Sequence, residues 1–185
     1  MTVSSAEVVA RLVELGQTVG CAESLTGGLV VARLVDTPGA SAVVRGGVVA
    51  YATALKASLL GVDAELLASR GAVDPDVAGQ MAVGAQQVLE ADWGVATTGV
   101  AGPEPQDRMP VGCVFVAVAE PGGSVVVERH DLPGGRPEIR AGAVDAALAL
   151  LAARIPGAPA WSRGAADWSR GAAAERPTSV VKRPK

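Results

Sequence analysis

Apolar residues recur along the chain at two spacings, and the alternation between the two predicts an α/β protein. Helical spacing, with an apolar side chain every three or four positions, extends over 5–15, 26–35, 54–60, 63–69, 75–90 and 137–154. Short apolar runs with the length and valine content of strands occupy 17–22, 43–51, 93–98, 111–119 and 124–131. A Pro-Gly-Gly turn at 121–123 joins the last two runs as a hairpin, so we expect a mixed sheet of five or six strands with helices on both faces.

The composition of the chain changes near Pro156. Of the 185 residues 49% are hydrophobic, which is enough to build the core of one domain over 1–155. The rest is rich in Gly, Ala, Pro and Arg, and the sequence Trp-Ser-Arg-Gly-Ala-Ala occurs at Trp161 and again at Trp168. We expect 156–185 to be a flexible basic tail, or a segment ordered only by a second subunit of a homo-oligomer.

Charge and cysteine usage narrow the class of protein. Residues 1–155 carry 10 Lys/Arg against 17 Asp/Glu, which disfavours nucleic acid as the main partner. Cys21 and Cys113 lie inside apolar runs, without the Cys/His spacing of a metal site, which predicts buried free thiols in a reducing cytoplasm. Because the chain shows neither a signal peptide nor an apolar run long enough to span a membrane, we expect a soluble cytoplasmic protein.

The polar stretch Glu23-Ser24-Leu25-Thr26-Gly27-Gly28 lies between a predicted strand and a predicted helix. Main-chain N–H groups and the positive end of a helix dipole at such a turn favour an anion or a developing oxyanion, so Ser24 is a candidate nucleophile. The spacing differs from G-x-x-x-x-G-K-[ST], from G-x-G-x-x-G and from the G-x-S-x-G elbow. A plain glycine-containing helix cap explains the same residues equally well.

A second cluster follows the paired glycines Gly46 and Gly47. Glycines inside a strand mark a bulge or a close backbone approach, and this strand ends at Tyr51, the one tyrosine of the chain. Lys56 comes five residues later. A core ring and a solvated helix lysine are the simpler explanations of these two side chains.

Two more clusters have features of ligand sites. Thr98 and Gly99 come at the end of a predicted strand, where α/β sheets commonly bind ligands, although a simple turn has the same pattern. Arg136 and Arg140 lie one turn apart at the start of the last predicted helix. Because arginine there opposes the helix dipole, we expect the pair to bind a phosphate.

A serine nucleophile needs a base, and the sequence restricts the choice. The one histidine, His130, lies between two charged residues late in a predicted strand, and no pattern places it near Ser24. A lysine that is partly removed from water can have its pKa lowered enough to accept a proton. Lys56 is therefore the candidate base.

Together and in order, these clusters resemble one family, the C-terminal domain of CinA, whose stand-alone form is the nicotinamide-nucleotide amidohydrolase. The resemblance covers about residues 5–155. Its motifs are Ala22-Glu23-Ser24-Leu25-Thr26-Gly27-Gly28, Asp36-Thr37-Pro38-Gly39-Ala40-Ser41, Gly46-Gly47-Val48-Val49-Ala50-Tyr51, Lys56, Leu59-Leu60-Gly61-Val62, Gly71-Ala72-Val73, Met81-Ala82-Val83-Gly84-Ala85, Thr98-Gly99-Val100-Ala101-Gly102-Pro103 and Pro110-Val111-Gly112. It implies a three-layer α/β/α sandwich that hydrolyses the carboxamide of nicotinamide mononucleotide, giving nicotinate mononucleotide and ammonia, without a cofactor or a metal.

The resemblance also implies roles for individual residues. Ser24 attacks the amide carbon, Lys56 takes its proton and protonates the departing ammonia, and Tyr51 assists that relay. Main-chain N–H groups near the glycines of the Ser24 turn, or at the turn after Thr98, hold the oxyanion. The residues implied to contact substrate are Glu23, Thr26, Gly27, Gly28, Gly46, Gly47, Thr98, Gly99, Arg136 and Arg140.

The sequence departs from the family pattern in three places. Leu25 stands where the family usually has cysteine, and Ala52-Thr53 replaces a Ser/Thr-Asn pair. The loop at 104–109 reads Glu-Pro-Gln-Asp-Arg-Met instead of a glycine-rich stretch ending in lysine. The stiffer loop predicts an altered rate or specificity, and the alternative function is a weakened mononucleotide-binding or regulatory module. A DNA-associated role, suggested by the competence-related family name, is disfavoured by the acidic body.

Overall fold

Five strands form one mixed sheet in the computed structural model, which describes residues 4–157 of the chain. The strands are β1 (Val19–Glu23), β2 (Val44–Val49), β3 (Trp93–Gly99), β4 (Cys113–Ala119) and β5 (Val125–Asp131). Their order across the sheet is β2-β1-β3-β4-β5, with β2, β1 and β3 parallel and the two later strands antiparallel. The predicted mixed sheet is confirmed, with five strands.

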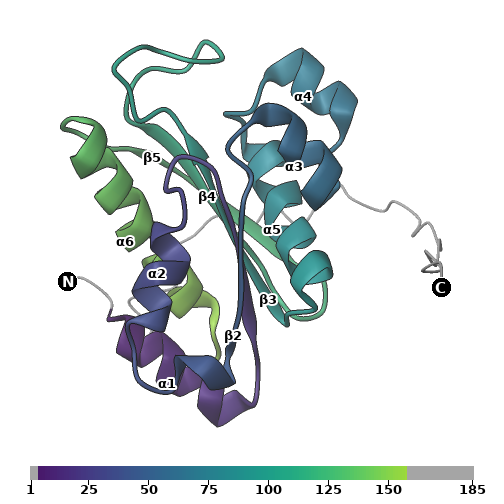
Figure 1. Cartoon of the computed structure of the whole chain (residues 1–185), viewed down its shortest axis with the longest axis vertical. Helices are drawn as coiled ribbons and strands as arrows, with labels where there is room; N and C mark the ends of the chain where they lie inside the picture. The colour runs from purple at the N-terminus through teal and green to yellow at the C-terminus, as the bar shows by residue number, and fades with distance from the viewer. Residues whose placement is uncertain (1–3, 158–185) are drawn as a thin grey trace, which may run out of the picture.

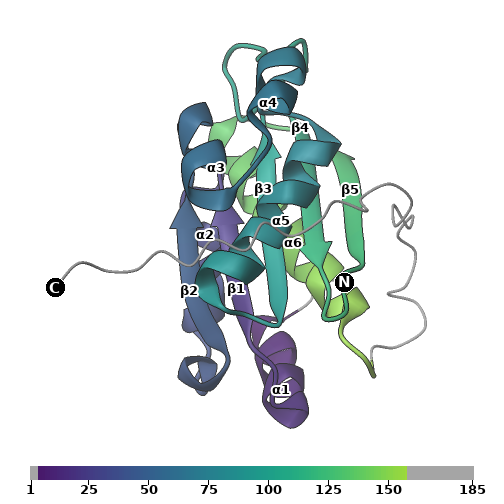
Figure 2. The same cartoon turned by 90° about the vertical axis from the view of Figure 1, so that its right-hand side faces the viewer.

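Helices cover both faces of this sheet, which confirms the three-layer α/β/α sandwich (Figure 1). On one face lie α1 (Ser5–Leu15), α2 (Leu29–Val35) and α6 (Arg136–Arg154). On the other lie α3 (Thr53–Leu60), α4 (Ala64–Arg70) and α5 (Pro75–Leu89). The view in Figure 2 shows α5 lying along the strands in front of the sheet.

Small side chains on one face of the sheet let α5 approach closely. Along β4, valines alternate with Phe115, Ala117 and Ala119; the valines face α1, α2 and α6, and the other residues face α5. In β3, a Cβ added at Gly94 would lie 2.0 Å from the Ala82 carbonyl oxygen of α5. The low aromatic content of the chain is therefore suited to this tight helix–sheet contact.

The helix boundaries follow capping chemistry. The Ser4 side chain accepts a hydrogen bond from the Ala6 N–H at the start of α1, and Gly16 ends that helix in the left-handed region. The helix predicted from residue 26 begins instead at Leu29, because Gly27 and Gly28 have φ values of 62° and 98° and form a turn. A short 3₁₀ helix, Ala40–Ala42, was not predicted.

The parallel strands bring the predicted clusters together. Because β1, β2 and β3 run in the same direction, their carboxyl ends meet at one edge of the sheet. Ser24 follows β1, Tyr51 lies two residues after β2, and Thr98 is the last residue but one of β3. Among residues 4–157 no helix is both long and apolar enough to cross a membrane. The predicted tail, 156–185, lies almost wholly outside the described residues.

Candidate active site

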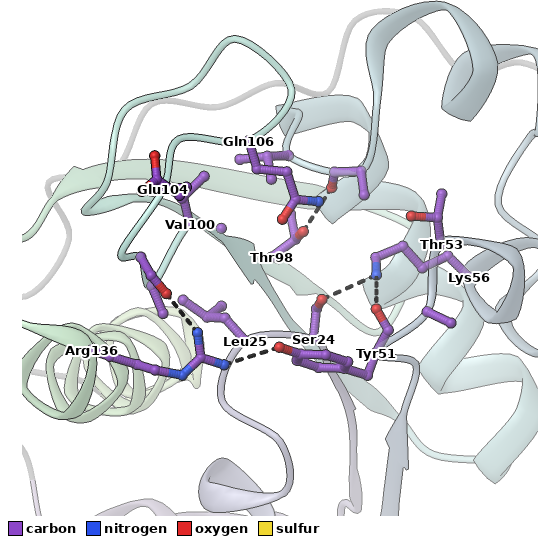
Figure 3. Close-up of a pocket in the computed structure, with 16 residues that line it drawn as sticks. Ser24, Leu25, Tyr51, Thr53, Lys56, Thr98, Val100, Glu104, Gln106 and Arg136 are labelled. Carbon is purple, nitrogen blue, oxygen red and sulfur yellow. Dashed lines mark hydrogen bonds between the residues drawn. The ribbon is translucent and has the colours of Figure 1, made fainter.

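A pocket of about 270 Å³ opens at the carboxyl edge of the sheet (Figure 3). Its lining comes from the residues after β1 and β2, the first residues of α3, Ala72 and Val73 between α4 and α5, the end of β3 and the loop that follows it, and the first residue of α6. The polar side chains in this lining are those of Ser24, Tyr51, Thr53, Lys56, Thr98, Glu104, Gln106 and Arg136. The pocket therefore joins segments that are far apart in the sequence.

Lys56 and Ser24 form a hydrogen-bonded pair at the base of this pocket (Figure 3). The Lys56 Nζ lies 3.0 Å from the Ser24 Oγ, and it also donates to the main-chain oxygens of Ala50, at 2.8 Å, and Tyr51, at 3.4 Å. Helix α3 starts directly after these two carbonyls, so its first turn carries Lys56 back over them. The predicted nucleophile and the predicted base are in direct contact.

Burial sets the electrostatics of the pair. The Lys56 side chain is only 1% exposed, and Ser24 is 9% exposed. Removal from water lowers the pKa of Lys56 to about 8, although the negative charge of Asp107 acts in the opposite direction. Near physiological pH the amine is therefore mostly protonated, with a minority in the neutral state that can accept a proton.

Glu23 was expected to contact substrate, but the structure places its carboxylate inside the protein. The side chain is 1% exposed and accepts hydrogen bonds from the N–H groups of Gly28, Val30 and Val31, at 2.9, 3.1 and 2.9 Å. A carboxylate at this position satisfies the free N–H groups at the start of α2 and interacts favourably with the helix dipole. Glu23 therefore fixes the turn that carries Ser24.

Thr26 and Arg140 also stabilise the turn that carries Ser24, through hydrogen bonds made outside the pocket. The Thr26 hydroxyl is fully buried and bonds to the Thr97 hydroxyl at 2.7 Å. Arg140 donates to the main-chain oxygens of Leu25 and Thr26, at 2.9 and 2.8 Å, and it is not part of the pocket lining. The expected phosphate contact of Arg140 is thus replaced by a contact with the protein's own carbonyls.

Four of the five glycines predicted to contact substrate, Gly27, Gly28, Gly46 and Gly47, lie outside the pocket lining. Gly27 and Gly28 form the turn, and the Gly28 N–H is already bonded to Glu23. Gly46 and Gly47 lie within β2, opposite Gly20 and Cys21, where a Cβ at Gly47 would be 3.1 Å from Val31. Gly47 therefore lets α2 and β2 pack closely, whereas a Cβ at Gly46, whose φ is +141°, would lie 3.7 Å from Leu89 of α5.

Thr98, Gly99 and Arg136 do lie at the pocket, as expected. The Thr98 hydroxyl donates to the Ala72 carbonyl at 2.7 Å, while Arg136 donates to the Gly102 carbonyl at 2.8 Å and to the Tyr51 hydroxyl at 3.0 Å. Tyr51 is 60% exposed, and its hydroxyl points to Arg136 at the pocket mouth (Figure 3). The hydroxyl is thus directed away from the proton relay that we expected it to assist, and only the Tyr51 carbonyl contacts Lys56.

Several pocket residues were not predicted. Glu104 and Gln106 come from the loop that departs from the family pattern, and Thr53 from the pair that does so. Leu25 also lines the pocket. The departures were the one sequence signal that marked these positions, because irregular loops carry no periodicity.

The two cysteines and the histidine lie outside the pocket lining. Burial raises the pKa of the Cys21 and Cys113 thiols, so neither forms a thiolate readily. His130 contacts Glu128 on β5. No cluster of three His, Cys, Asp or Glu side chains suited to a metal ion occurs in residues 4–157.

Fold and site define an α/β sandwich with a buried serine–lysine pair at the carboxyl edge of its sheet. The family model of the CinA C-terminal domain matches residues 2–155. The chain therefore belongs to the CinA C-terminal domain family.

Individual relatives agree with this assignment. The chain is 51% identical over 152 residues to a CinA-like protein of Frankia casuarinae, covering 82% of this chain and 35% of that protein. A CinA-like protein of Mycolicibacterium gilvum is 46% identical over 143 residues, covering 77% of this chain and 34% of that protein. The chain thus spans about a third of the length of the curated relatives it matches.

Solved structures match over nearly their whole length. The competence/damage inducible protein CihA from Agrobacterium tumefaciens superposes with a TM-score of 0.74 at 38% identity, covering 82% of this chain and 96% of that one. A CinA superfamily protein from Klebsiella pneumoniae gives 0.76 at 32% identity, covering 80% and 92%. These proteins share the fold described here.

Proposed function

We propose that this chain hydrolyses the carboxamide of nicotinamide mononucleotide to nicotinate mononucleotide and ammonia. The observation that carries the proposal is the 3.0 Å contact between the buried Lys56 Nζ and the Ser24 Oγ at the base of a pocket. Amide hydrolysis needs a nucleophile and a group that removes its proton and returns it to a poor leaving group. A serine–lysine pair supplies both. The substrate is the one implied by the family resemblance.

The hydrogen bonds of Lys56 support its role as the base. A neutral amine has two N–H bonds and one lone pair. The carbonyls of Ala50 and Tyr51 accept hydrogen bonds from these two N–H groups, which leaves the lone pair directed toward the Ser24 hydroxyl. In this state the hydroxyl donates and the amine accepts.

The proposed reaction then proceeds in two halves. Ser24 Oγ attacks the amide carbon while its proton moves to Lys56, and the protonated lysine then gives a proton to the amide nitrogen as the C–N bond breaks and ammonia leaves. Water attacks the resulting serine ester after giving a proton to Lys56, and that proton returns to Ser24 as the carboxylic acid is released. Main-chain N–H groups at the pocket wall, those of Leu25 and Gly99, are the proposed oxyanion donors.

The pocket is large enough for only part of the proposed substrate. Its volume of about 270 Å³ is below the roughly 300–1,000 Å³ typical of sites that enclose a drug-sized ligand. We assign the pocket to the carboxamide and its ring, with the ribose and phosphate at the mouth. Arg136 lies there, and a guanidinium suits a phosphate.

The proposal is tested by ammonia release and by chromatographic detection of nicotinate mononucleotide. Ser24→Ala should abolish both, whereas Ser69→Ala, a change of the same size at an exposed helix position, should leave them unchanged. Product formed undiminished by Ser24→Ala would contradict the mechanism. The loop at 104–109 favours the alternative of a binding module, and calorimetry that shows tight mononucleotide binding without turnover would support that alternative.

A further inference from the structure

We infer that Asp107 is a positioning residue that fixes the wall of the pocket facing Lys56. It lies on the loop that departs from the family pattern, directly after Gln106, which lines the pocket. The consequences for turnover rest on the proposed function, whereas the structural consequences do not. Neither composition nor the family motifs pointed to this residue.

The carboxylate of Asp107 is bonded to a second segment of the pocket wall. One of its oxygens, Oδ2, accepts hydrogen bonds from the N–H groups of Ala72 and Val73, at 2.7 and 3.1 Å. Ala72 and Val73 line the pocket themselves. The carboxylate therefore joins two pocket segments that are separated by 34 and 35 positions in the sequence.

The protein makes room for this side chain at Gly71. A Cβ at Gly71 would lie 2.4 Å from the Asp107 Cγ, and its φ of +84° is itself unfavourable for other residues. The segment is also held from its other side, since the Ala72 carbonyl accepts from the Thr98 hydroxyl at 2.7 Å. Ala72 is thus fixed through its N–H by Asp107 and through its oxygen by β3.

The backbone of the loop is shaped around the same contact. Gln106 and Met109 exchange main-chain hydrogen bonds of 3.2 and 2.8 Å, and the two residues between them form a tight turn. Both turn residues, Asp107 and Arg108, have positive φ values, of 52° and 63°. Such a backbone is unfavourable for residues other than glycine, asparagine and aspartate, and the Asp107 hydrogen bonds help to hold it.

Asp107 also acts on Lys56 through its charge. Its negative charge raises the pKa of Lys56, in opposition to the stronger effect of burial. The other ionisable side chains of the pocket are Glu104, Arg136 and Tyr51, and the direct partners of the amine are the Ser24 hydroxyl and two carbonyls. Asp107 thus has a mechanical effect and an electrostatic effect, and these can be separated.

Two substitutions separate them. Asp107→Asn keeps one oxygen that can accept from both N–H groups and tolerates the left-handed backbone, but it removes the charge. Asp107→Ala removes both the accepting oxygen and the charge. Asp36→Asn is the matched control, because it removes one negative charge from an exposed residue at the end of α2. Gly71→Ala displaces the Asp107 side chain without altering it.

The first readout is amide hydrogen exchange at Ala72 and Val73, measured by NMR without substrate. We expect exchange at both to be at least about tenfold faster in Asp107→Ala and in Gly71→Ala, and close to wild type in Asp107→Asn and Asp36→Asn. Unchanged protection in Asp107→Ala, with the fold intact by circular dichroism, overturns the inference. Equal loss in Asp107→Asn and Asp107→Ala overturns the assignment of the contact to one accepting oxygen.

The second readout is the pH dependence of kcat/KM on nicotinamide mononucleotide. The midpoint should move to lower pH in Asp107→Asn and stay in place in Asp36→Asn, while Asp107→Ala should also lower the plateau by about ten- to a hundredfold. A midpoint in Asp107→Asn equal to that of the control overturns the electrostatic part. If the wild-type chain shows no turnover, the proposed function fails, and the exchange measurement still decides the role of Asp107.

Discussion

Two buried charged side chains, those of Glu23 and Lys56, lie next to Ser24, and they differ in what they are hydrogen-bonded to. Glu23 and Lys56 are both 1% exposed. Glu23 is bonded to three main-chain N–H groups of the protein, while Lys56 is bonded to two main-chain oxygens and to the Ser24 hydroxyl. The Glu23 carboxylate therefore stabilises the main chain of the turn, whereas the Lys56 amine contacts Ser24, the proposed nucleophile.

The two arginines of α6 repeat this contrast. Arg140 is bonded to carbonyls of the Ser24 turn, whereas Arg136, one turn earlier, lies at the pocket mouth. We call Glu23, Thr26 and Arg140 the interior side of the turn, and Lys56, Tyr51 and Arg136 its pocket side. Residues on the interior side should matter for stability, and those on the pocket side for turnover.

The largest expected effect is that of Lys56→Met on turnover. Removing the proposed base should lower kcat/KM on nicotinamide mononucleotide by about 10³- to 10⁴-fold, which ammonia release measures. In the wild type, kcat/KM should rise with pH and level off above the Lys56 pKa of about 8. A Lys56→Met enzyme that works within tenfold of wild type would show that another group is the base.

The same substitution has a pH-dependent effect on stability whose sign is fixed. The pKa of Lys56 is about 8 in the folded protein and near 10.5 when unfolded, so folding opposes protonation. The resulting loss of stability is complete below pH 8 and disappears as the pH rises to 10.5. The stability of Lys56→Met relative to wild type should therefore fall by as much as about 3 kcal/mol across this range in urea unfolding.

The second effect concerns the interior side, through Glu23→Gln. The carboxylate accepts hydrogen bonds from main-chain N–H groups through both of its oxygens. In glutamine one of these oxygens is replaced by an NH₂ group, which cannot accept them, so we expect a loss of about 2–4 kcal/mol in the free energy of unfolding. The control is Glu138→Gln, since Glu138 makes an exposed hydrogen bond to the Gly135 N–H at 3.1 Å. Its loss should stay below about 1 kcal/mol. Equal losses in the two variants would remove the distinction between the sides.

The sequence predicted the fold and the proximity of Ser24 and Lys56 better than it predicted which residues face the pocket. Parallel strands bring their carboxyl ends to one edge, so Ser24, Lys56, Thr98 and Gly99 could be expected to lie near one another. The prediction that Glu23 contacts substrate was wrong. Neighbouring positions of a strand point to opposite faces, so if Ser24 faces the pocket, the side chain of the residue before it is expected to point into the protein.

Other positions depended on features that the sequence pattern does not carry. Gly46 and Gly47 were expected at the pocket, but they pair with the middle of β1, away from the strand ends. Arg140 finds its partners in the turn because α6 passes behind it, and only the tertiary fold brings those partners together. The pocket wall made by Glu104 and Gln106 comes from an irregular loop, for which periodicity gives no direction.

The third effect separates the two arginines. Arg136→Ala should raise KM for nicotinamide mononucleotide about tenfold, with the thermal midpoint unchanged, because the substitution removes the proposed phosphate contact from an exposed position. It should leave the KM for nicotinamide riboside, which lacks the phosphate, unaltered. Arg140→Ala should instead cost about 1–2 kcal/mol of stability, since two carbonyls lose their donor. An equal rise in KM for both substrates would count against the phosphate contact of Arg136.

The smallest expected effect, that of Tyr51→Phe, tests whether Tyr51 belongs to the proton relay. Its hydroxyl accepts from Arg136 at 3.0 Å, while the contact with Lys56 is made by the main-chain carbonyl, which phenylalanine retains. We therefore expect kcat to change by less than about threefold. Tyr51→Ala, which also removes the ring from the pocket lining, should act more strongly and mainly on KM. A hundredfold loss of kcat in Tyr51→Phe would instead mean that the phenol turns toward the amine during the reaction, and it would extend the proposed Ser24–Lys56 pair to a triad.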